Sequence, residues 1–206
     1  MTAGKSNKII IDLCGGTGSW SKPYKEAGYD VRLVTLPDNN VLTYEPPENV
    51  YGILAAPPCT AFSITGKRNK ENMNKAMEVV NACINIIEMC KPVFWALENP
   101  VGFLSDFIGK QKLIFQPFEY GDGWTKKTAV WGSFNIPIPI YKWADCPKVN
   151  LPKRAGRKKP SLPYAHKNQI LDIPQMSWAK DLCKTDADAR AITPPSFARA
   201  FYEANK

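Results

Sequence analysis

Short apolar runs alternate with turns and helical segments over the first hundred residues, and this alternation constrains the fold most. Four runs have the length and composition of buried strands: residues 8–13, 29–34, 51–56 and 93–97. Between them, residues 21–27 carry a proline suited to a helix start, and residues 73–90 place apolar side chains at helical spacing. This order predicts an α/β fold with a doubly wound, mostly parallel sheet.

Two of the predicted strands lead into triplets with reactive side chains. Pro57-Pro58-Cys59 follows one strand, and Glu98-Asn99-Pro100 follows another about forty residues later. The carboxyl ends of neighbouring parallel strands meet at one edge, where open α/β sheets bind ligands. A thiol beside a carboxylate suits attack on an electron-poor ring carbon. A buried inert cysteine, and a carboxylate that caps a helix or forms an ion pair, are the alternatives.

A glycine-rich turn follows the first strand. Its small residues, Gly15-Gly16-Thr17-Gly18, would let the backbone approach a nucleotide-like cofactor closely, although a tight structural turn explains them too. The dinucleotide fingerprint requires a third glycine where Ser21 stands, and this disfavours an NAD-dependent enzyme.

Composition limits the size class, the location and the binding partners that the protein can have. The 206 residues fit one domain with a small appendage, and no apolar stretch reaches the ~18 residues that span a membrane. The N-terminus leads directly into a strand without a signal peptide, so we expect a cytoplasmic protein, in bacteria or a phage-infected host. The chain has 27 lysine and arginine residues against 19 acidic ones, which makes nucleic acid the first candidate partner, with a basic surface that binds nothing as the alternative. Six cysteines without a Cys-x-x-Cys pair, and one histidine, predict no metal site.

The second half of the chain differs from the first in composition, because it is richer in proline and basic residues. Prolines alternate with isoleucines over residues 136–140, which excludes an ordinary central strand. Residues 153–160 form a cationic loop bounded by proline, and residues 196–204 read as a final helix opened by two prolines. We therefore expect three parts. Residues 1–134 form an α/β core for catalysis and cofactor binding, and residues 135–189 form a small irregular basic segment that contacts DNA. Residues 190–206 form a C-terminal motif that packs back on the core.

Taken in order, these motifs resemble the DNA cytosine-5 methyltransferases, which use S-adenosylmethionine. The segment from Asp12 to Trp20 is similar to the family's Asp-x-Phe-x-Gly-x-Gly loop, with Cys14 in place of phenylalanine. Pro57-Pro58-Cys59 matches the nucleophile motif, and Glu98-Asn99 matches the Glu-Asn-Val motif. Thr125-Lys126-Lys127-Thr128 lies where the family has Gln-x-Arg-x-Arg, and Thr193-Pro194-Pro195 resembles the last motif. The small size suggests a phage-like member.

The resemblance implies a Rossmann-like fold of the S-adenosylmethionine-dependent type with a reduced target-recognition segment, acting as a monomer on double-stranded DNA. It implies that Cys59 adds to carbon-6 of a flipped cytosine, that Glu98 holds the proton on ring nitrogen 3, and that Lys126 and Lys127 assist. The residues it implies for the cofactor are Asp12, Cys14, Gly15, Gly16, Thr17, Gly18, Trp20, Thr35, Asn40, Pro57 and Thr193. Those implied for DNA contact are Ser63, Lys153, Arg154, Arg157, Lys158 and Lys159.

The chain departs from the family pattern at the cofactor contacts. Thr35 stands where an acidic residue usually binds the ribose, with Asp38 a little later, and Asn40 lies nearest to the position of the adenine-binding acid. Arg190-Ala191 replaces Gly-Asn in the final motif. The alternatives are therefore a catalytically silent DNA-binding relative, an enzyme that uses a modified, carboxylated sulfonium donor facing Arg190, and an enzyme that acts on tRNA.

Overall fold

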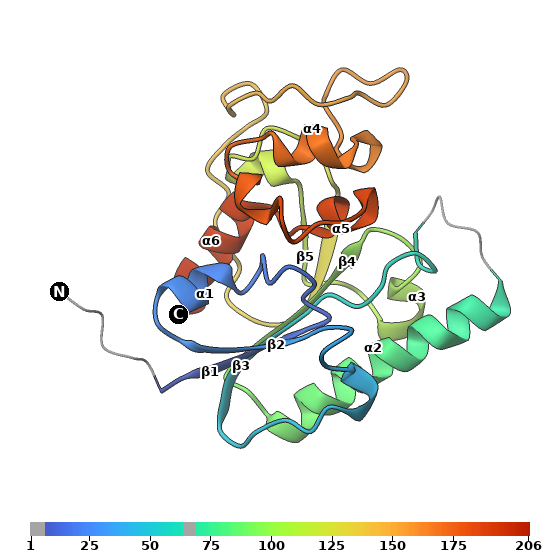
Figure 1. Cartoon of the computed structure of the whole chain (residues 1–206), viewed down its shortest axis with the longest axis vertical. Helices are drawn as coiled ribbons and strands as arrows, with labels where there is room; N and C mark the ends of the chain where they lie inside the picture. Colours follow the sequence, from blue (N-terminus) through green and yellow to red (C-terminus); the bar gives the residue numbers. More distant parts are fainter. Residues whose placement is uncertain (1–6, 64–68) are drawn as a thin grey trace.

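A six-stranded sheet forms the centre of the protein in a computed structural model that describes residues 7–63 and 69–206 (Figure 1). The strand order is β2-β1-β3-β4-β6-β5. The first four strands in that order are parallel, while β6 is antiparallel to both of its neighbours. The strands are β1 (Ile9–Leu13), β2 (Asp30–Val34), β3 (Val50–Ala55), β4 (Phe94–Pro100), β5 (Leu113–Phe115) and β6 (Thr128–Ser133). The predicted doubly wound, mostly parallel sheet is confirmed.

Helices cover both faces of the sheet, because alternate strand residues point to opposite sides. Ile11 and Ile53 belong to the core cluster beneath α2 (Lys70–Cys90). Ile10 and Leu54, one position away, belong to the cluster beneath the other face. That face is covered by α1 (Lys22–Glu26) and α6 (Pro195–Ala204), which lie across the sheet from α2 (Figure 1). The short α3 (Ser105–Ile108) follows β4.

The predicted elements lie close to the observed ones. The long helix begins at Lys70, three residues before the predicted start, because the Asn69 side chain accepts a hydrogen bond from the backbone N–H of Asn72 and caps the first turn. No strand forms over residues 136–140, as the prolines predicted. Across residues 7–63 and 69–206, no helix is long and apolar enough to cross a membrane.

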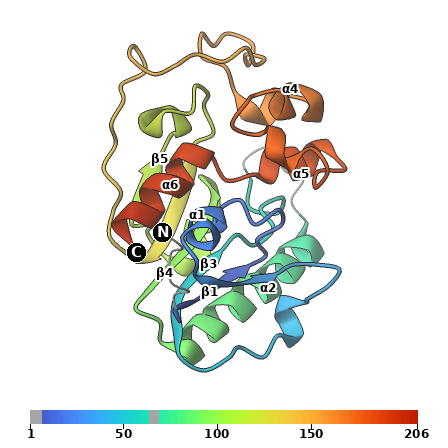
Figure 2. The ribbon, with the colours of Figure 1, turned by 60° about the vertical axis from the view of Figure 1, so that its left-hand side comes forward.

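A third hydrophobic cluster stands above the sheet edge (Figure 2). It contains α4 (Lys167–Leu171) and α5 (Asp186–Ala191) and buries Leu162, Ile170 and Met176. Part of the segment that we expected to be irregular, residues 135–189, therefore has its own core. Trp124 from the preceding segment is also buried in this core. Sequence periodicity missed it because these helices have only one or two turns. The 3-10 turns are η1 (Val41–Thr43), η2 (Pro117–Tyr120), η3 (Leu162–Tyr164) and η4 (Ser177–Ala179).

Candidate active site

The site lies where β4 extends beyond its parallel neighbour. Pairing between β3 and β4 ends at Ala55 and Leu97, so Glu98 and Asn99 continue past the end of β3. On the other side, β6 runs antiparallel and its first residue, Thr128, pairs with Pro100. The carboxyl end of β4 and the start of β6 thus share one edge. This brings the turns after β3 and before β6 beside Glu98.

The turn that carries Cys59 is fixed by its backbone. The Cys59 carbonyl oxygen accepts hydrogen bonds from the N–H groups of Phe62 and Ser63, each at 3.0 Å. The Phe62 carbonyl in turn accepts the N–H of Phe103 at 2.9 Å. A β-carbon at Gly102 would lie 2.2 Å from that same carbonyl oxygen, so only glycine permits this approach. Sequence analysis missed Gly102, since a single glycine in a loop has no distinctive signal.

Asn99 joins β4 to the nucleophile turn. Its side chain is buried, and its Nδ2 donates a hydrogen bond of 3.0 Å to the carbonyl oxygen of Pro57. Its Oδ1 is buried without a hydrogen-bond partner in the described part of the chain. The contact orients the turn two residues before Cys59 and leaves one polar acceptor unused within the site.

Three charged or ionisable groups act on one another here. Burial raises the pKa of the Cys59 thiol, the charge of Glu98 raises it further, and the Lys126 ammonium opposes both effects. Burial also raises the pKa of the Glu98 carboxyl, again opposed by Lys126. The carboxyl is therefore easier to keep protonated than an exposed glutamate, and Lys126 favours the thiolate form of Cys59.

Lys126 and its neighbour differ in position. The backbone N–H of Lys126 donates to Gln116 Oε1 at 3.1 Å, and its Nζ lies 3.5 Å from the Ile192 carbonyl oxygen. Lys127 is exposed, and its carbonyl accepts the N–H of Val101. Of the two predicted lysines, Lys126 is thus the one that acts on the thiol and the carboxyl. Gln116 and Ile192 were not predicted, because these contacts join segments far apart in sequence.

The glycine-rich turn adopts the backbone expected of a cofactor cradle. Gly16 and Gly18 have φ angles of 55° and 70°, which glycine adopts without strain. A β-carbon on Gly15 would lie 2.5 Å from Cγ of Asp12, so the turn packs directly against that carboxyl. Cys14 also has a positive φ of 55°, and its N–H donates to the Val34 carbonyl at 2.7 Å. A turn lies where sequence analysis expected one, and its contact with a cofactor stays a prediction.

Asp12 is fully buried beneath the turn. Its Oδ2 accepts a hydrogen bond of 2.6 Å from Ser21 Oγ, while Oδ1 has no partner among the described residues. Burial raises its pKa to about 6, with the hydrogen bonds from Ser21 opposing that rise. An acceptor buried without a partner beside a positive-φ turn is consistent with a cradle that donates and accepts hydrogen bonds to a polar ligand.

The remaining predicted cofactor residues occupy different environments. Thr193 is buried, and its N–H donates to Ser19 Oγ at 2.8 Å, which joins the last motif to the glycine-rich turn. Thr35 is partly buried directly after β2. Asn40 is exposed, and its Oδ1 already accepts the N–H of Leu42. The Trp20 ring lies in the core against Phe197 and Phe201, with a centroid distance of 5.4 Å to Phe201.

The Trp20 side chain is 2% exposed and contributes to the packing of α6. Thr17 is partly buried within the turn, and Pro57 is buried beside Asn99. No structural finding tests cofactor contact at these positions, which stay predictions.

The segment that contains Cys59 and Glu98 is similar to known DNA methylases. Residues 22–115, which include Cys59 and Glu98, match the family model of the C-5 cytosine-specific DNA methylases. Over these residues the chain is similar to that family. The type II methyltransferase M.DdeI of Desulfomicrobium norvegicum is 28% identical over 120 residues, covering 47% of this chain. The chain spans only 28% of that relative's length.

A solved structure supports the fold. It is a candidate DNA modification methyltransferase encoded within an E. coli prophage, with a TM-score of 0.51 and 15% sequence identity. The match covers 70% of this chain and 53% of that one. At this identity the likeness concerns the methylase fold alone.

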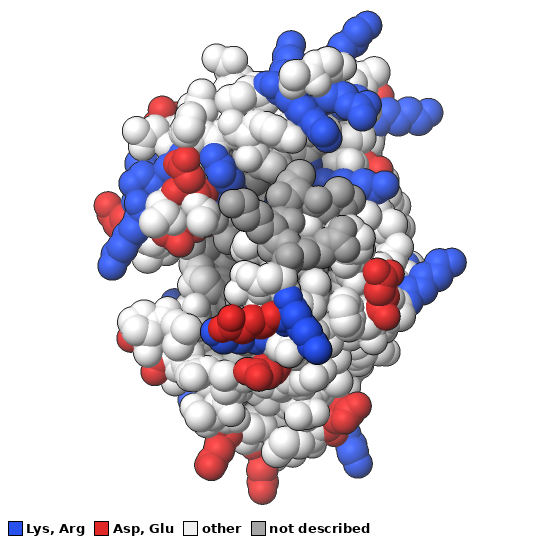
Figure 3. Space-filling view, turned by 90° about the vertical axis from the view of Figure 1, so that its right-hand side faces the viewer, with Lys and Arg blue, Asp and Glu red and all other residues white. Residues whose placement is uncertain are grey.

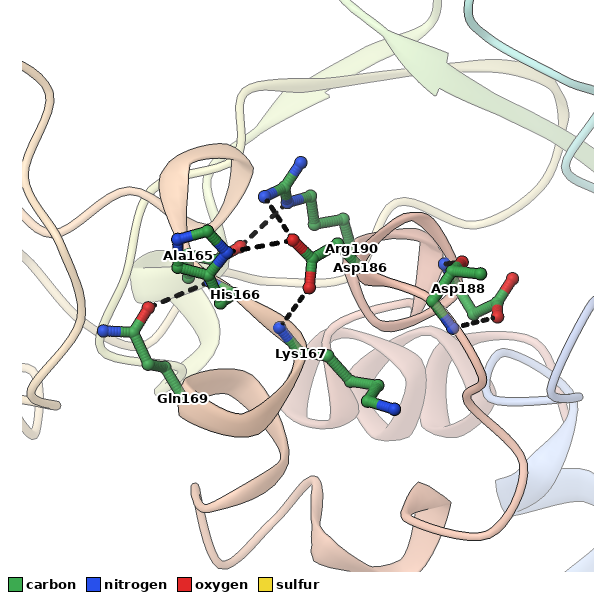
Figure 4. Close-up of polar contacts among 8 residues, drawn as sticks. Ala165, His166, Lys167, Gln169, Asp186, Asp188 and Arg190 are labelled. Carbon is green, nitrogen blue, oxygen red and sulfur yellow. Dashed lines mark hydrogen bonds and ion pairs between the residues drawn. The ribbon is translucent and has the colours of Figure 1, made fainter.

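Arg190 is already engaged by hydrogen bonds and an ion pair. Its Nε donates to the Ala165 carbonyl at 2.8 Å, and a second guanidinium nitrogen lies 3.3 Å from Asp186 Oδ2 (Figure 4). The same carboxylate is 3.0 Å from Nδ1 of His166 and accepts the Lys167 N–H at 2.7 Å. These contacts fasten α4 to α5. Arg190 thus has an anionic partner within α5, and the carboxylated-donor alternative stays untested.

The predicted cationic loop folds as a small hairpin. Lys153 and Pro160 form a β-bridge, and the Arg157 N–H donates to the Arg154 carbonyl at 2.9 Å. Lys159 is held over two rings, 4.4 Å from the centroid of Phe118 and 5.0 Å from that of Trp143. The exposed cations at its tip are Arg154, Arg157 and Lys158.

The hairpin belongs to a strongly cationic stretch. Residues 142–159 hold seven basic side chains and one acidic one. Lysine and arginine gather on the upper part of the face shown in Figure 3, while acidic residues are commoner on its lower part. Ser63, the remaining residue that we assigned to DNA contact, lies in the Cys59 turn, where its N–H donates to the Cys59 carbonyl; its contact with DNA stays a prediction.

Proposed function

We propose that the protein is a DNA cytosine-5 methyltransferase. The observation that carries the proposal is the convergence of Cys59, Glu98 and Lys126 at one sheet edge, within the segment that matches the methylase family. A thiol nucleophile, a carboxyl with a raised pKa and a fixed cation are the groups needed to activate a pyrimidine ring.

The chemistry assigns a role to each group. The Cys59 thiolate adds to carbon-6 of cytosine, and the Lys126 ammonium favours the thiolate. Glu98 holds a proton at ring nitrogen 3, which neutralises the charge that addition creates; burial keeps that proton on the carboxyl more readily. Carbon-5 then becomes nucleophilic and accepts the methyl group, after which loss of the carbon-5 proton expels Cys59. The reacting base must leave the helical stack to reach a thiol in this position.

The methyl donor that fits the family is S-adenosylmethionine, whose sulfonium supplies an electrophilic methyl group when bound. The glycine-rich turn, the buried acceptor of Asp12 and the adjoining Thr193 are the groups that would hold it. The basic hairpin would contact the phosphates of double-stranded DNA, because exposed cations there can replace condensed counterions.

A covalent trap tests the proposal. Double-stranded DNA that contains 5-fluorocytosine is incubated with the protein and S-adenosylmethionine, because fluorine at carbon-5 cannot leave as a proton. We expect a denaturation-resistant protein–DNA adduct in the wild type and in Cys90→Ser, the matched control, and none in Cys59→Ser. DNA binding without an adduct in the wild type would favour the silent DNA-binding alternative, and an adduct formed only with tRNA would favour the RNA-acting one.

A further inference from the structure

A small cavity lies between α1, α6 and η4, beside the glycine-rich turn. Its volume is about 120 Å³, and Ser19 and Thr193 are among the residues that line it. Both residues are 6% exposed, and the Ser19 Oγ accepts the Thr193 N–H at 2.8 Å. Among the described residues, the Ser19 hydroxyl has no acceptor for its own hydrogen, so it can donate to a ligand. The cavity therefore shares two residues with the segments that we assign to the methyl donor.

The rim of the cavity carries charges of both signs. It is formed by Lys22 on α1 and Arg199 on α6, helices that lie side by side (Figure 1), and both cations form ion pairs with Glu26. The Lys22 ammonium also lies 5.5 Å from the ring centroid of Trp178, which forms one wall. Each cation has a single acceptor in the described part of the chain, so both keep N–H groups for a ligand. The cavity thus offers donors to an anionic group and a carboxylate to a cationic one.

Size and charge together define the ligand. A volume of about 120 Å³ is roughly that of four water molecules in the liquid, which accommodates an α-amino-acid group and excludes a purine nucleoside. An α-amino-acid group carries a carboxylate and an ammonium, and these complement the two cations and the one anion of the rim. A phosphate ion fits less well, because Glu26 would repel it from between the two cations.

We propose that this cavity binds the α-amino-acid group of the methyl donor and makes that group a determinant of donor specificity. Lys22 and Arg199 bind the donor carboxylate, and Glu26 binds the donor ammonium. The inference rests on the proposed function, which assigns the donor to the glycine-rich turn and Thr193. None of the three charged residues belongs to the motifs that carry the family resemblance.

The charges at this end complement the neutral groups predicted for the ribose end. Thr35 stands where the resembled family usually has an acidic residue, and Asn40 Oδ1 already accepts the N–H of Leu42. Charge-assisted hydrogen bonds are roughly twice as strong as neutral ones. Donor affinity in this chain should therefore depend more on the amino-acid group than on the ribose.

Calorimetric titration with two ligands tests the inference. S-adenosylhomocysteine carries the amino-acid group, whereas 5′-methylthioadenosine has the same nucleoside and sulfur without it. We expect Lys22→Gln and Arg199→Gln each to weaken S-adenosylhomocysteine binding by about tenfold, because each removes a hydrogen bond between charged groups. Neither should change the affinity for 5′-methylthioadenosine. Lys25→Gln is the matched control, because Lys25 is exposed on α1 outside the cavity lining, and it should change neither affinity.

A second variant separates ligand binding from the packing of the two helices. Trp178→Leu leaves both ion pairs with Glu26 intact and should weaken S-adenosylhomocysteine binding alone, by about threefold. Unchanged S-adenosylhomocysteine affinity in all three cavity variants overturns the inference. Equal weakening of both ligands in all three also overturns it, because the residues would then only hold α1 against α6. A wild type that binds 5′-methylthioadenosine as tightly as S-adenosylhomocysteine overturns the inference alone, whereas a wild type that binds neither contradicts the proposed function and the inference with it.

Discussion

Replacement of Asp122 by asparagine should stabilise the protein near neutral pH. Asp122 is fully buried, and its carboxylate accepts hydrogen bonds from the backbone N–H and the hydroxyl of Ser196, both at 3.0 Å, at the start of α6. Burial nevertheless raises its pKa to about 6, so these bonds do not offset the cost of burying the charge. An asparagine can accept the N–H and donate to the hydroxyl, which keeps both contacts without a charge.

The size of the effect follows from the shift in pKa. A carboxyl with a pKa of about 3.9 in the unfolded chain and about 6 in the fold loses roughly 3 kcal/mol of stability at pH 7.5. That stability is fully present below pH ~4 and is lost as the pH rises through about 6, because the folded state binds the proton more tightly. Asp122→Asn should therefore gain about 1–3 kcal/mol over the wild type at pH 7.5 and little at pH 4.

Urea unfolding at the two pH values, followed by circular dichroism, measures this difference. The exposed Asp145 provides the matched control, and its asparagine variant should change stability by less than about 0.5 kcal/mol. A variant at position 122 that is less stable than the wild type at both pH values would refute the reasoning. It would mean that the ionised carboxylate stabilises α6 more than its burial costs.

Three further predictions concern the site itself. Glu98→Gln should lower the methylation rate by ~10²–10⁴, and should remove the alkaline loss of rate that arises in the wild type as Glu98 gives up its proton; an undiminished rate would assign Glu98 to structure. Thr35→Asp should tighten S-adenosylmethionine binding in calorimetry, because charge-assisted hydrogen bonds to a ribose are roughly twice as strong as neutral ones; unchanged affinity would mean that Thr35 does not face the ribose. Alanine in place of the exposed hairpin cations Arg154, Arg157 and Lys158 should weaken DNA binding on all sequences and reduce the salt slope by about one unit for each phosphate that is no longer neutralised; an altered site preference at constant slope would contradict that role.

The sheet and the reactive edge were predictable because their signals are local. Apolar runs marked the buried strands, and Cys59 after β3 and Glu98 near the end of β4 lie at the same edge, as expected. The rule that parallel strands present their carboxyl ends together required no knowledge of the helices. The positive-φ turn after β1 was equally local, since its glycines permit the backbone that the structure shows.

The contacts that fix the site were not predictable, because they join distant segments. Gly102 packs against the Phe62 carbonyl, and Ser19 accepts the N–H of Thr193 across most of the chain. The burial of the Trp20 ring was not predictable for a related reason. It adjoins a cofactor-like turn in sequence, but α6 brings Phe201 against its ring and buries it. The contact of Arg190 with the Ala165 carbonyl likewise joins α5 to the segment before α4, whereas its ion pair with Asp186 lies within α5.

The central claim is that this chain transfers a methyl group to carbon-5 of cytosine in DNA. The most direct measurement is mass analysis of nucleosides from double-stranded DNA incubated with the protein and S-adenosylmethionine whose methyl group carries deuterium. The account predicts deuterated 5-methyldeoxycytidine with the wild type and none with Cys59→Ser. Unmodified deoxycytidine in DNA that the wild-type protein demonstrably binds, or label on another nucleoside, would contradict it.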